Sequence, residues 1–194
     1  MADLDQIKQL REITNVSLAQ CKKALEQSNG NLEKSQEILR KWGEDLAGKV
    51  AGRKAGQGIV EAYIHSNKKI GVLLELRCET DFVARNEDFK ILAHDLAMQV
   101  AATNPLYVSE DEISQELLDK EKEIYQEQFA ASGKPKEIMD KMIEGKPAKY
   151  KEGICLIKQP FIKDQTKKVE DIIKACIGKL GENIFVKRFV KIEI

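Results

Sequence analysis

Alternating apolar residues between positions 70 and 78 constrain the fold of this chain more than any other feature. In the segment IGVLLELRC, every even position is apolar: Ile70, Val72, Leu74, Leu76 and Cys78. A period of two is typical of a β-strand with one buried face. The preceding segment IVEAYIH predicts a second strand, and SNKK between the two fits a four-residue hairpin loop. The sequence therefore predicts a β-hairpin.

The C-terminal segment NIFVKRFVKIEI predicts a third strand. Its even positions form one apolar face that only Arg188 interrupts: Ile184, Val186, Val190, Ile192 and Ile194. The other face carries Phe185 and Phe189, which makes it more apolar than a solvated face requires. We therefore expect a second packing surface on this strand.

Residues 1–45 predict three short helices. Their apolar stripes are Ile7, Leu10 and Ile13, then Leu18, Cys21, Ala24 and Leu25, and finally Leu32, Ile38 and Leu39. Ser17 and Asn31 are expected N-caps, and Gly30 is an expected helix stop. A unit of this size has a shallow core, which favours docking over chemistry. The glycine-rich residues 46–56 are then interpreted as a linker.

Helical patterns lie between the second and third predicted strands. The first has Phe89, Leu92, Ala93, Leu96, Ala97, Val100 and Ala101 on one face and ends at Asn104-Pro105. Ser109 and Glu112 match a capping box before a helix with Ile113, Leu117, Ile124 and Phe129. A helix is expected at 135–143, and another would bury Val169, Ile172, Ile173, Cys176 and Leu180. Grouped strands with inserted helices favour an α+β core over residues 57–194, with a three-stranded antiparallel sheet packed by helices.

Charge balance and cysteine spacing restrict the function. Lys plus Arg and Asp plus Glu both number 32 in 194 residues, so no bulk positive field favours direct nucleic-acid or membrane binding. The N-terminus lacks a secretory pattern, and no stretch approaches ~18 apolar residues. Cys21, Cys78, Cys155 and Cys176 are far apart, which disfavours a zinc site or disulfides. We expect a reduced, cytoplasmic protein.

Catalytic constellations are missing from the sequence. His65 and His94 have no partner at metal or triad spacing, and the carboxylates alternate with lysines as on solvated helix faces. No nucleophile motif or cofactor fingerprint is present. The expectation is a protein that is not an enzyme, with no cofactor and no metal.

One aromatic residue lies where a strand meets a helix. In CETDFVARNEDF (78–89), Phe82 follows Asp81 directly after the predicted second strand. A phenylalanine at such a corner is most often core. However, Val83 and Phe89 are available to close the corner, and Asp81 would put a charge beside a buried ring. Both fates, core residue and partner contact, remain open from the residues alone.

The same segment resembles the T-D-F-V-A signature of the elongation factor Ts family, the guanine-nucleotide exchange factors of elongation factor Tu. LREITNVSLAQCKKALEQSNGNLEKS is similar to the family's ubiquitin-associated-like three-helix docking domain. DLAMQVAATNPLYV resembles its core helix, and SGKPKEIMDKMIEGKPAKY followed by KQPFIKD resembles its later helices. The likeness covers nearly the whole chain.

The resemblance implies a mechanism and partners. Thr80, Asp81, Phe82 and Val83 would form a wedge that disturbs the Mg²⁺ and phosphate site of elongation factor Tu, while Val16, Ser17 and Gln99 would contribute to docking. Gln99 stands where many family members have histidine. A single core module matches the short family members that pair as homodimers, which implies a two-plus-two complex. Phe185 and Phe189 would suit that pairing.

Two other functions are compatible with parts of the sequence. The N-terminal helices could belong to an adaptor of the ubiquitin-associated type that has no exchange activity. Alternatively, Lys49, Arg53 and Lys54 could bind RNA. Partners recovered from solution distinguish the three functions: a GTPase, ubiquitin, or RNA retained in a salt-sensitive manner.

Overall fold

The computed structural model describes residues 3–14, 16–130 and 149–194. Contacts divide the chain into two compact units. The first comprises Met1–Glu61, Glu75–His94 and Asp171–Lys187, and the second comprises Ala62–Leu74, Asp95–Glu170 and Arg188–Ile194. The chain therefore passes between the units several times.

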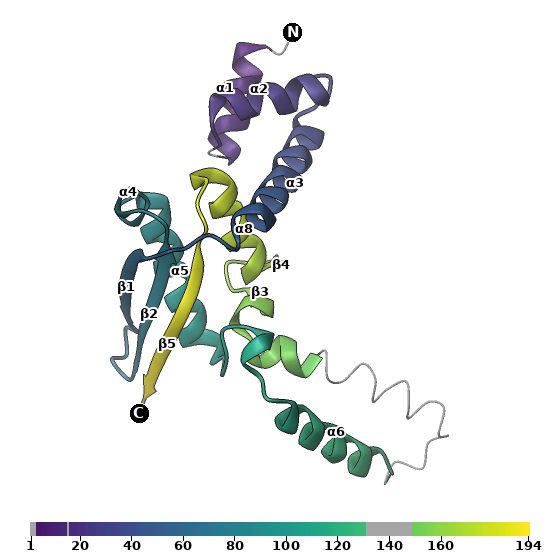
Figure 1. Ribbon diagram of the computed structural model, residues 1–194, viewed down its shortest axis with the longest axis vertical. Helices are drawn as coiled ribbons and strands as arrows, with labels where there is room; N and C mark the ends of the chain where they lie inside the picture. The colour runs from purple at the N-terminus through teal and green to yellow at the C-terminus, as the bar shows by residue number, and fades with distance from the viewer. Residues whose placement is uncertain (1–2, 15, 131–148) are drawn as a thin grey trace. The chain divides into compact units, whose positions relative to one another are not determined.

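Three helices begin the first unit: α1 (Leu4–Thr14), α2 (Leu18–Gln27) and α3 (Leu32–Val50) (Figure 1). Their common core contains Ile7, Leu10, Cys21, Ala24, Leu25 and Leu39, and Val16, Leu32, Ile38 and Trp42 pack against it. Two residues that were expected to face inward do not, because Ile13 is 55% exposed and Leu18 is 47% exposed. The apolar stripes of α1 and α2 thus continue beyond the core at the turn that joins them.

The predicted caps of these helices are confirmed. The Ser17 hydroxyl accepts a hydrogen bond from the Gln20 amide at 3.4 Å, and Asn31 Oδ1 accepts one from the Lys34 amide at 2.9 Å. Gly30 has a φ of 81°, a conformation that glycine adopts readily. Short polar side chains therefore set where α2 and α3 begin.

A three-stranded antiparallel sheet forms as predicted. Its order is β1 (Gln57–Ile64), β2 (Ile70–Cys78) and β5 (Phe185–Glu193), so β2 is central (Figure 1). The His65 amide donates to the Ile70 carbonyl at 2.9 Å and closes the β1–β2 hairpin. Val72, Leu74, Leu76 and Cys78 are buried, as their alternation predicts.

Strand β5 differs from the expected pattern. Its even-numbered face is buried only at the start, at Ile184 and Val186. Val190, Ile192 and Ile194 are 55%, 66% and 92% exposed. On the other face, Phe185 is 38% exposed and Phe189 is half-buried. The more exposed apolar side chains of β5 therefore lie on its even-numbered face.

Two helices carry most of the remaining core. In α5 (Glu87–Thr103), all of the residues predicted to face inward are buried. In α8 (Val169–Leu180), Val169, Ile173 and Cys176 are buried, as is Ile177, whereas Ile172 and Leu180 are only partly buried. A Cβ atom on Gly178 would lie 2.9 Å from the Cα atom of Gly43, so α8 and α3 approach closely there. Glycine at this crossing permits the backbone contact.

The predicted capping box is wrong. Residues Glu110–Glu112 form a short 3₁₀ helix (η1), and among the described residues the Ser109 side chain caps no amide. The Glu112 carboxylate instead accepts from the Val108 amide at 2.9 Å. Helix α6 (Gln115–Ala130) begins later, where the Ser114 hydroxyl accepts from the Leu117 amide at 3.3 Å. Ile113 is buried, but Ile124 is 45% exposed.

The segment before α8 also departs from expectation. KQPFIKD (158–164), compared with a family helix, instead begins at the end of a short 3₁₀ helix, η2 (Leu156–Lys158), and contains β3 (Pro160–Phe161). It ends at the first residue of β4 (Asp164–Lys168), which pairs with β3 in a hairpin. The helix expected at 135–143 and the Phe129 side chain lie outside the described residues.

Candidate functional site

The turn after the central strand carries the T-D-F-V motif. Strand β2 ends at Cys78, and residues Asp81–Ala84 form the short helix α4. Thr80 precedes the helix in an extended conformation (φ −122°, ψ 158°), and its hydroxyl accepts a hydrogen bond from the Val83 amide at 3.4 Å. Threonine serves as an N-cap because its side-chain oxygen satisfies an amide that has no partner within the helix. The four motif residues thus lie on one capped turn.

The Phe82 ring lies outside the protein's own core. Phe82 is 81% exposed, whereas Ala84 is 7% exposed and Phe89 is fully buried. Ala84 therefore anchors the inner side of the turn, and Phe89 supplies the buried ring at the start of α5. The sequence left open whether Phe82 is a core residue or a surface residue, and in the structure it is a surface residue. Leaving such apolar area in water is unfavourable by about 25 cal/mol per Å², an energy that is recovered when a partner covers the ring.

A charged pair lies beside the exposed ring. Asp81 Oδ2 and the Arg85 guanidinium are 3.0 Å apart, and their side chains are 49% and 80% exposed. An exposed ion pair of this kind contributes about 0–1 kcal/mol to stability because water screens it. Both charges consequently remain at the surface, where a partner could reach them.

The thiol below this turn is held in its protonated form. Cys78 Sγ donates to the Thr80 carbonyl at 3.2 Å. Burial, with a smaller contribution from the nearby Glu182 carboxylate, raises the pKa of the Cys78 thiol to about 11. A protonated, buried thiol is a poor nucleophile. Cys78 therefore acts as a structural residue of the turn.

Gln99 is placed inside the second unit. It is fully buried on α5, and its Oε1 accepts a hydrogen bond from the Ile162 amide at 2.8 Å. Its Nε2 donates to Gln159 Oε1 at 3.2 Å and to the Pro160 carbonyl at 3.1 Å. These bonds tie the β3–β4 hairpin to α5. The Gln99 side chain, for which the family resemblance implied a docking role, presents no surface to a partner in this structure.

The other nominated docking residues lie at the α1–α2 turn. Val16 packs against the N-terminal core, and the exposed Ser17 caps α2. Ile13 and Leu18 flank them with exposed side chains. Both residues were expected in the core because they fall on the apolar stripes of their helices. The turn between α1 and α2 therefore carries two exposed apolar side chains beside Val16 and Ser17.

Comparison with known proteins identifies the family. The family model described as "Elongation factor TS" matches residues 5–194. The chain belongs to the elongation factor Ts family. It is 52% identical over 188 residues to Elongation factor Ts of Thermosipho melanesiensis, which covers 97% of this chain and 96% of that protein. It is 53% identical over 191 residues to that of Thermotoga petrophila (98% and 95%) and 51% identical over 189 residues to that of Koribacter versatilis (97% and 86%).

Membership in the elongation factor Ts family supports a role in translation elongation as a nucleotide exchange factor of elongation factor Tu. Within the described part of the chain, no cluster of three or more His, Cys, Asp or Glu side chains is arranged to hold a metal ion. No helix formed by these residues has the length and apolarity needed to cross a membrane.

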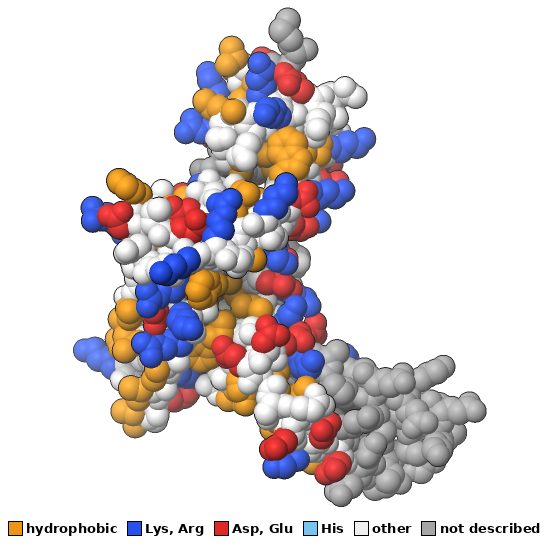
Figure 2. Space-filling view, in the orientation of Figure 1, with side chains coloured by type: hydrophobic (Ala, Val, Ile, Leu, Met, Phe, Trp, Pro, Cys, Tyr) orange, Lys and Arg blue, Asp and Glu red, His pale blue; other side chains and the backbone are white. Residues whose placement is uncertain are grey.

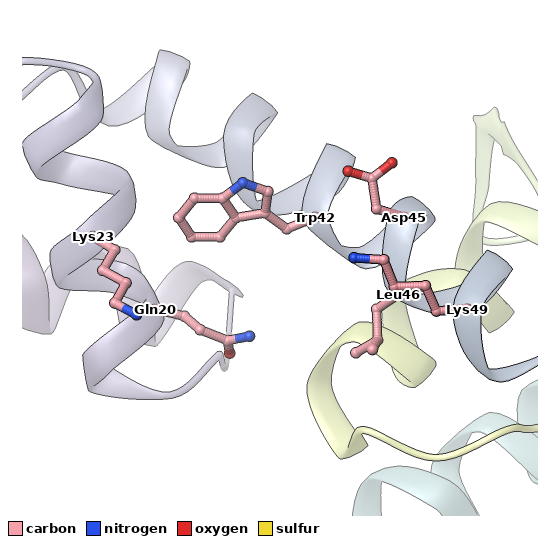
Figure 3. Close-up of a pocket in the computed structure, with 6 residues that line it drawn as sticks. All are labelled: Gln20, Lys23, Trp42, Asp45, Leu46 and Lys49. Carbon is pink, nitrogen blue, oxygen red and sulfur yellow. The ribbon is translucent and has the colours of Figure 1, made fainter.

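An open pocket lies on the N-terminal helices of this elongation factor Ts chain (Figure 3). It is lined by Gln20, Lys23, Trp42, Asp45, Leu46 and Lys49. Figure 3 shows the Trp42 ring extending from α3 toward α2, with Lys23 on the other side. Lys49, one of the residues considered for RNA binding, lies near Asp45, and Arg53 pairs with Glu79 at 3.7 Å. Mixed charge of this kind does not form the basic stripe that a phosphate backbone requires.

Proposed function

We propose that this chain releases GDP from elongation factor Tu by inserting the Thr80–Val83 turn beside the partner's Mg²⁺ and phosphate site. The observation that carries the proposal is the 81% exposure of Phe82 on a capped turn. A large ring on an ordered turn loses little conformational entropy on binding. Buried aromatic anchors of this type contribute most of the binding energy at many interfaces.

The proposed mechanism needs no bond to break. Mg²⁺ and the phosphates of GDP hold each other in the partner, so a ring that displaces the supports of the metal weakens both. The coupling is reciprocal: the chain lowers the partner's affinity for GDP, and GDP lowers the partner's affinity for the chain by the same factor. Asp81 would assist through polar contacts, since its carboxylate lies at the surface beside Phe82.

The N-terminal helices are proposed as a docking domain of the ubiquitin-associated-like type, over residues 1–45. The linker expected at 46–56 is shorter than the sequence indicated, because α3 continues to Val50 and buries Ala47 and Val50. Support comes from the separate core of α1, α2 and α3 and from the exposed apolar residues Ile13 and Leu18 at one turn. Docking through the α1–α2 turn would hold the chain on elongation factor Tu while the Phe82 turn inserts beside the partner's Mg²⁺ and phosphate site. Loss of docking should then weaken binding more than it slows release within the complex.

A second copy of the chain is proposed to pair through the open face of the sheet and give a two-plus-two complex. In the second unit this face carries Ile64, Leu73, Val190, Ile192 and Ile194, all more than half exposed. Figure 2 shows hydrophobic side chains gathered around the C-terminal end of the sheet. Contiguous exposed apolar patches of this kind mark protein–protein contacts.

Strand register supports the continuity of this patch. A Cβ on Gly71 would lie 3.1 Å from Ile64 Cδ1, so these neighbours share a face. The Ile194 amide donates to the Lys69 carbonyl at 3.0 Å, and antiparallel pairing from that bond puts Ile192 opposite Gly71. Ile64 and Ile192 therefore flank Gly71 on the same face. Phe189 lies on the opposite face of β5. A role of Phe185 and Phe189 in dimer formation therefore remains a prediction.

Release of labelled GDP from elongation factor Tu tests the proposed function. Addition of the full chain in substoichiometric amounts should accelerate release, because each molecule acts repeatedly, and GTP should remain uncleaved. An unchanged release rate with a cognate elongation factor Tu would refute the proposal.

A further inference from the structure

The loop between α8 and β5 reaches the turn that carries Phe82. Its Glu182 carboxylate accepts through Oε2 from the Glu79 amide at 3.1 Å and from the Thr80 amide at 3.0 Å. Glu182 Oε1 accepts from the Thr80 hydroxyl at 2.6 Å. Hydrogen bonds to an ionised carboxylate are shorter and stronger than neutral ones. One side chain therefore holds both residues that precede α4.

The next residue of the loop strengthens this attachment. The Asn183 amide donates to Glu79 Oε1 at 2.7 Å. The Asn183 side chain, which is buried, donates to the Arg53 carbonyl at 2.8 Å and to the Ala51 carbonyl at 3.3 Å. Three segments that are distant in sequence thus meet behind the turn, and Glu182 is the one that contacts Thr80.

Helix α4 depends on such outside support. It spans only Asp81–Ala84, and a single helical turn is unfavourable by itself because its residues are fixed for very few hydrogen bonds. Its N-cap bond, from the Val83 amide to the Thr80 hydroxyl, is long at 3.4 Å. The same hydroxyl donates its proton to Glu182, which orients the oxygen. The direction of the Phe82 ring therefore follows from the backbone that Glu182 holds.

We propose that Glu182 is a positioning residue for nucleotide exchange. It fixes Glu79 and Thr80 and, through α4, aims Phe82 at the partner. This inference rests on the exchange function proposed above. Because Glu182 would act through Phe82, it should affect release within the complex more than formation of the complex.

The test measures GDP release from elongation factor Tu over a range of concentrations of the full chain. Glu182→Ala should lower the maximal release rate about tenfold, since small misplacements of an acting group can cost up to about 10²-fold. The half-saturating concentration should change less than about threefold, because the docking turn at Ser17 is untouched. Glu182→Gln keeps one acceptor oxygen and should give an intermediate rate.

A matched control removes a carboxylate charge elsewhere. Glu152 pairs with Lys168 at 2.7 Å and is about as exposed as its partner. Glu152→Gln should keep the parent rate, which would exclude a general effect of charge. Amide hydrogen exchange of the free protein adds a direct readout, since Glu79 and Thr80 should lose protection in Glu182→Ala while α5 keeps it.

A double variant decides whether Glu182 acts through Phe82. If it does, Phe82→Ala with Glu182→Ala should release GDP no more slowly than Phe82→Ala alone, whereas independent effects multiply. If the rate losses of the two single variants multiply in the double variant, the positioning role is overturned and the Phe82 mechanism still holds. The same conclusion follows if folded Glu182→Ala keeps the maximal release rate of the parent. If Glu182→Ala does not fold, the positioning role is overturned when Glu182→Gln keeps the maximal release rate of the parent. A parent rate in Phe82→Ala would instead reject the exchange mechanism together with this inference.

Discussion

Phe82 and Phe89 belong to neighbouring helices yet occupy opposite environments, since Phe82 of α4 is 81% exposed and Phe89 of α5 is fully buried. The Asn86 turn separates them. Its amide donates to the Val83 carbonyl at 2.9 Å, and its Oδ1 accepts from the Asp88 amide at 2.8 Å. This turn ends α4 and begins α5 in a new direction. The two rings therefore offer a matched pair of truncations.

Phe82→Ala should leave stability almost unchanged and reduce GDP release about tenfold or more, because an aromatic anchor at an interface contributes ~2 kcal/mol or more. Phe89→Ala should lower the free energy of unfolding by roughly 3–5 kcal/mol, since it empties a core site. Denaturant unfolding and labelled-GDP release on both variants make the comparison. A large loss of stability in Phe82→Ala with normal release from the folded fraction would contradict this assignment.

Leu18→Lys should weaken docking on elongation factor Tu without slowing release once the complex has formed. The side chain is 47% exposed beside the cap of α2, so the substitution spares the core. The half-saturating concentration should rise about tenfold, which corresponds to roughly 1.4 kcal/mol of lost binding. Leu4→Lys is the control, because Leu4 is 71% exposed at the other end of α1. Equal effects of the two substitutions would argue against a specific docking turn.

Ile192→Lys should convert a dimer to monomer. A lysine at the centre of an apolar interface would lose its hydration without gaining a partner charge, a cost of several kcal/mol. Sedimentation velocity over a range of concentrations reports the change. Ile91→Lys makes the same chemical change at an exposed isoleucine of α5, and the protein should remain a dimer in the same measurement. If Phe189→Lys dissociates the dimer and Ile192→Lys does not, pairing uses the other face of β5.

Gly178→Ala should destabilise the first unit. The new Cβ would lie 2.9 Å from the Cα atom of Gly43, which would force α8 and α3 apart and cost about 1–3 kcal/mol. Gly48→Ala is the matched control, since no atom lies within 4 Å of its Cβ position on α3. It should stabilise by roughly 0.5–1 kcal/mol, because alanine is the better helix former. Urea unfolding of the two variants should therefore shift in opposite directions.

Stability should fall above pH 9 because of Cys176. Burial, with a smaller contribution from the Asp88 carboxylate, raises the pKa of this thiol from 9.0 to about 12. Between these values the folded protein keeps a proton that the unfolded chain has lost. Unfolding then releases a proton. The stabilisation that this thiol contributes is therefore fully present below pH 9, and the free energy of unfolding decreases by about 1.4 kcal/mol per pH unit above it.

Urea unfolding of the parent and of Cys176→Ala at pH 8 and pH 10, under reducing conditions, isolates this contribution. The parent should lose about 1.4 kcal/mol more than the variant between those conditions, because only about one pH unit lies above the unfolded pKa. Parallel losses in both proteins would show that Cys176 does not titrate in this way.

Local pattern in the sequence determined most of the elements of this protein. The alternation at 70–78 specified β2, the polar residues Ser17 and Asn31 specified helix starts, and the apolar spacing of α5 specified its buried face. Each of these features depends on neighbours within a few residues, which is the range over which strand and helix periodicity act. The T-D-F-V-A motif likewise indicated a resemblance to the family, because its residues are contiguous.

Tertiary contacts decided the environment of single side chains. Gln99 is buried because the β3–β4 hairpin folds onto α5, and Ile192 is exposed because no described element of the second unit covers that face of β5. Thr80 meets Glu182 although the two are 102 residues apart. Periodicity predicts which face of an element is apolar, but what covers that face depends on packing between distant segments. The exposure of Phe82 was therefore settled only by the folded chain.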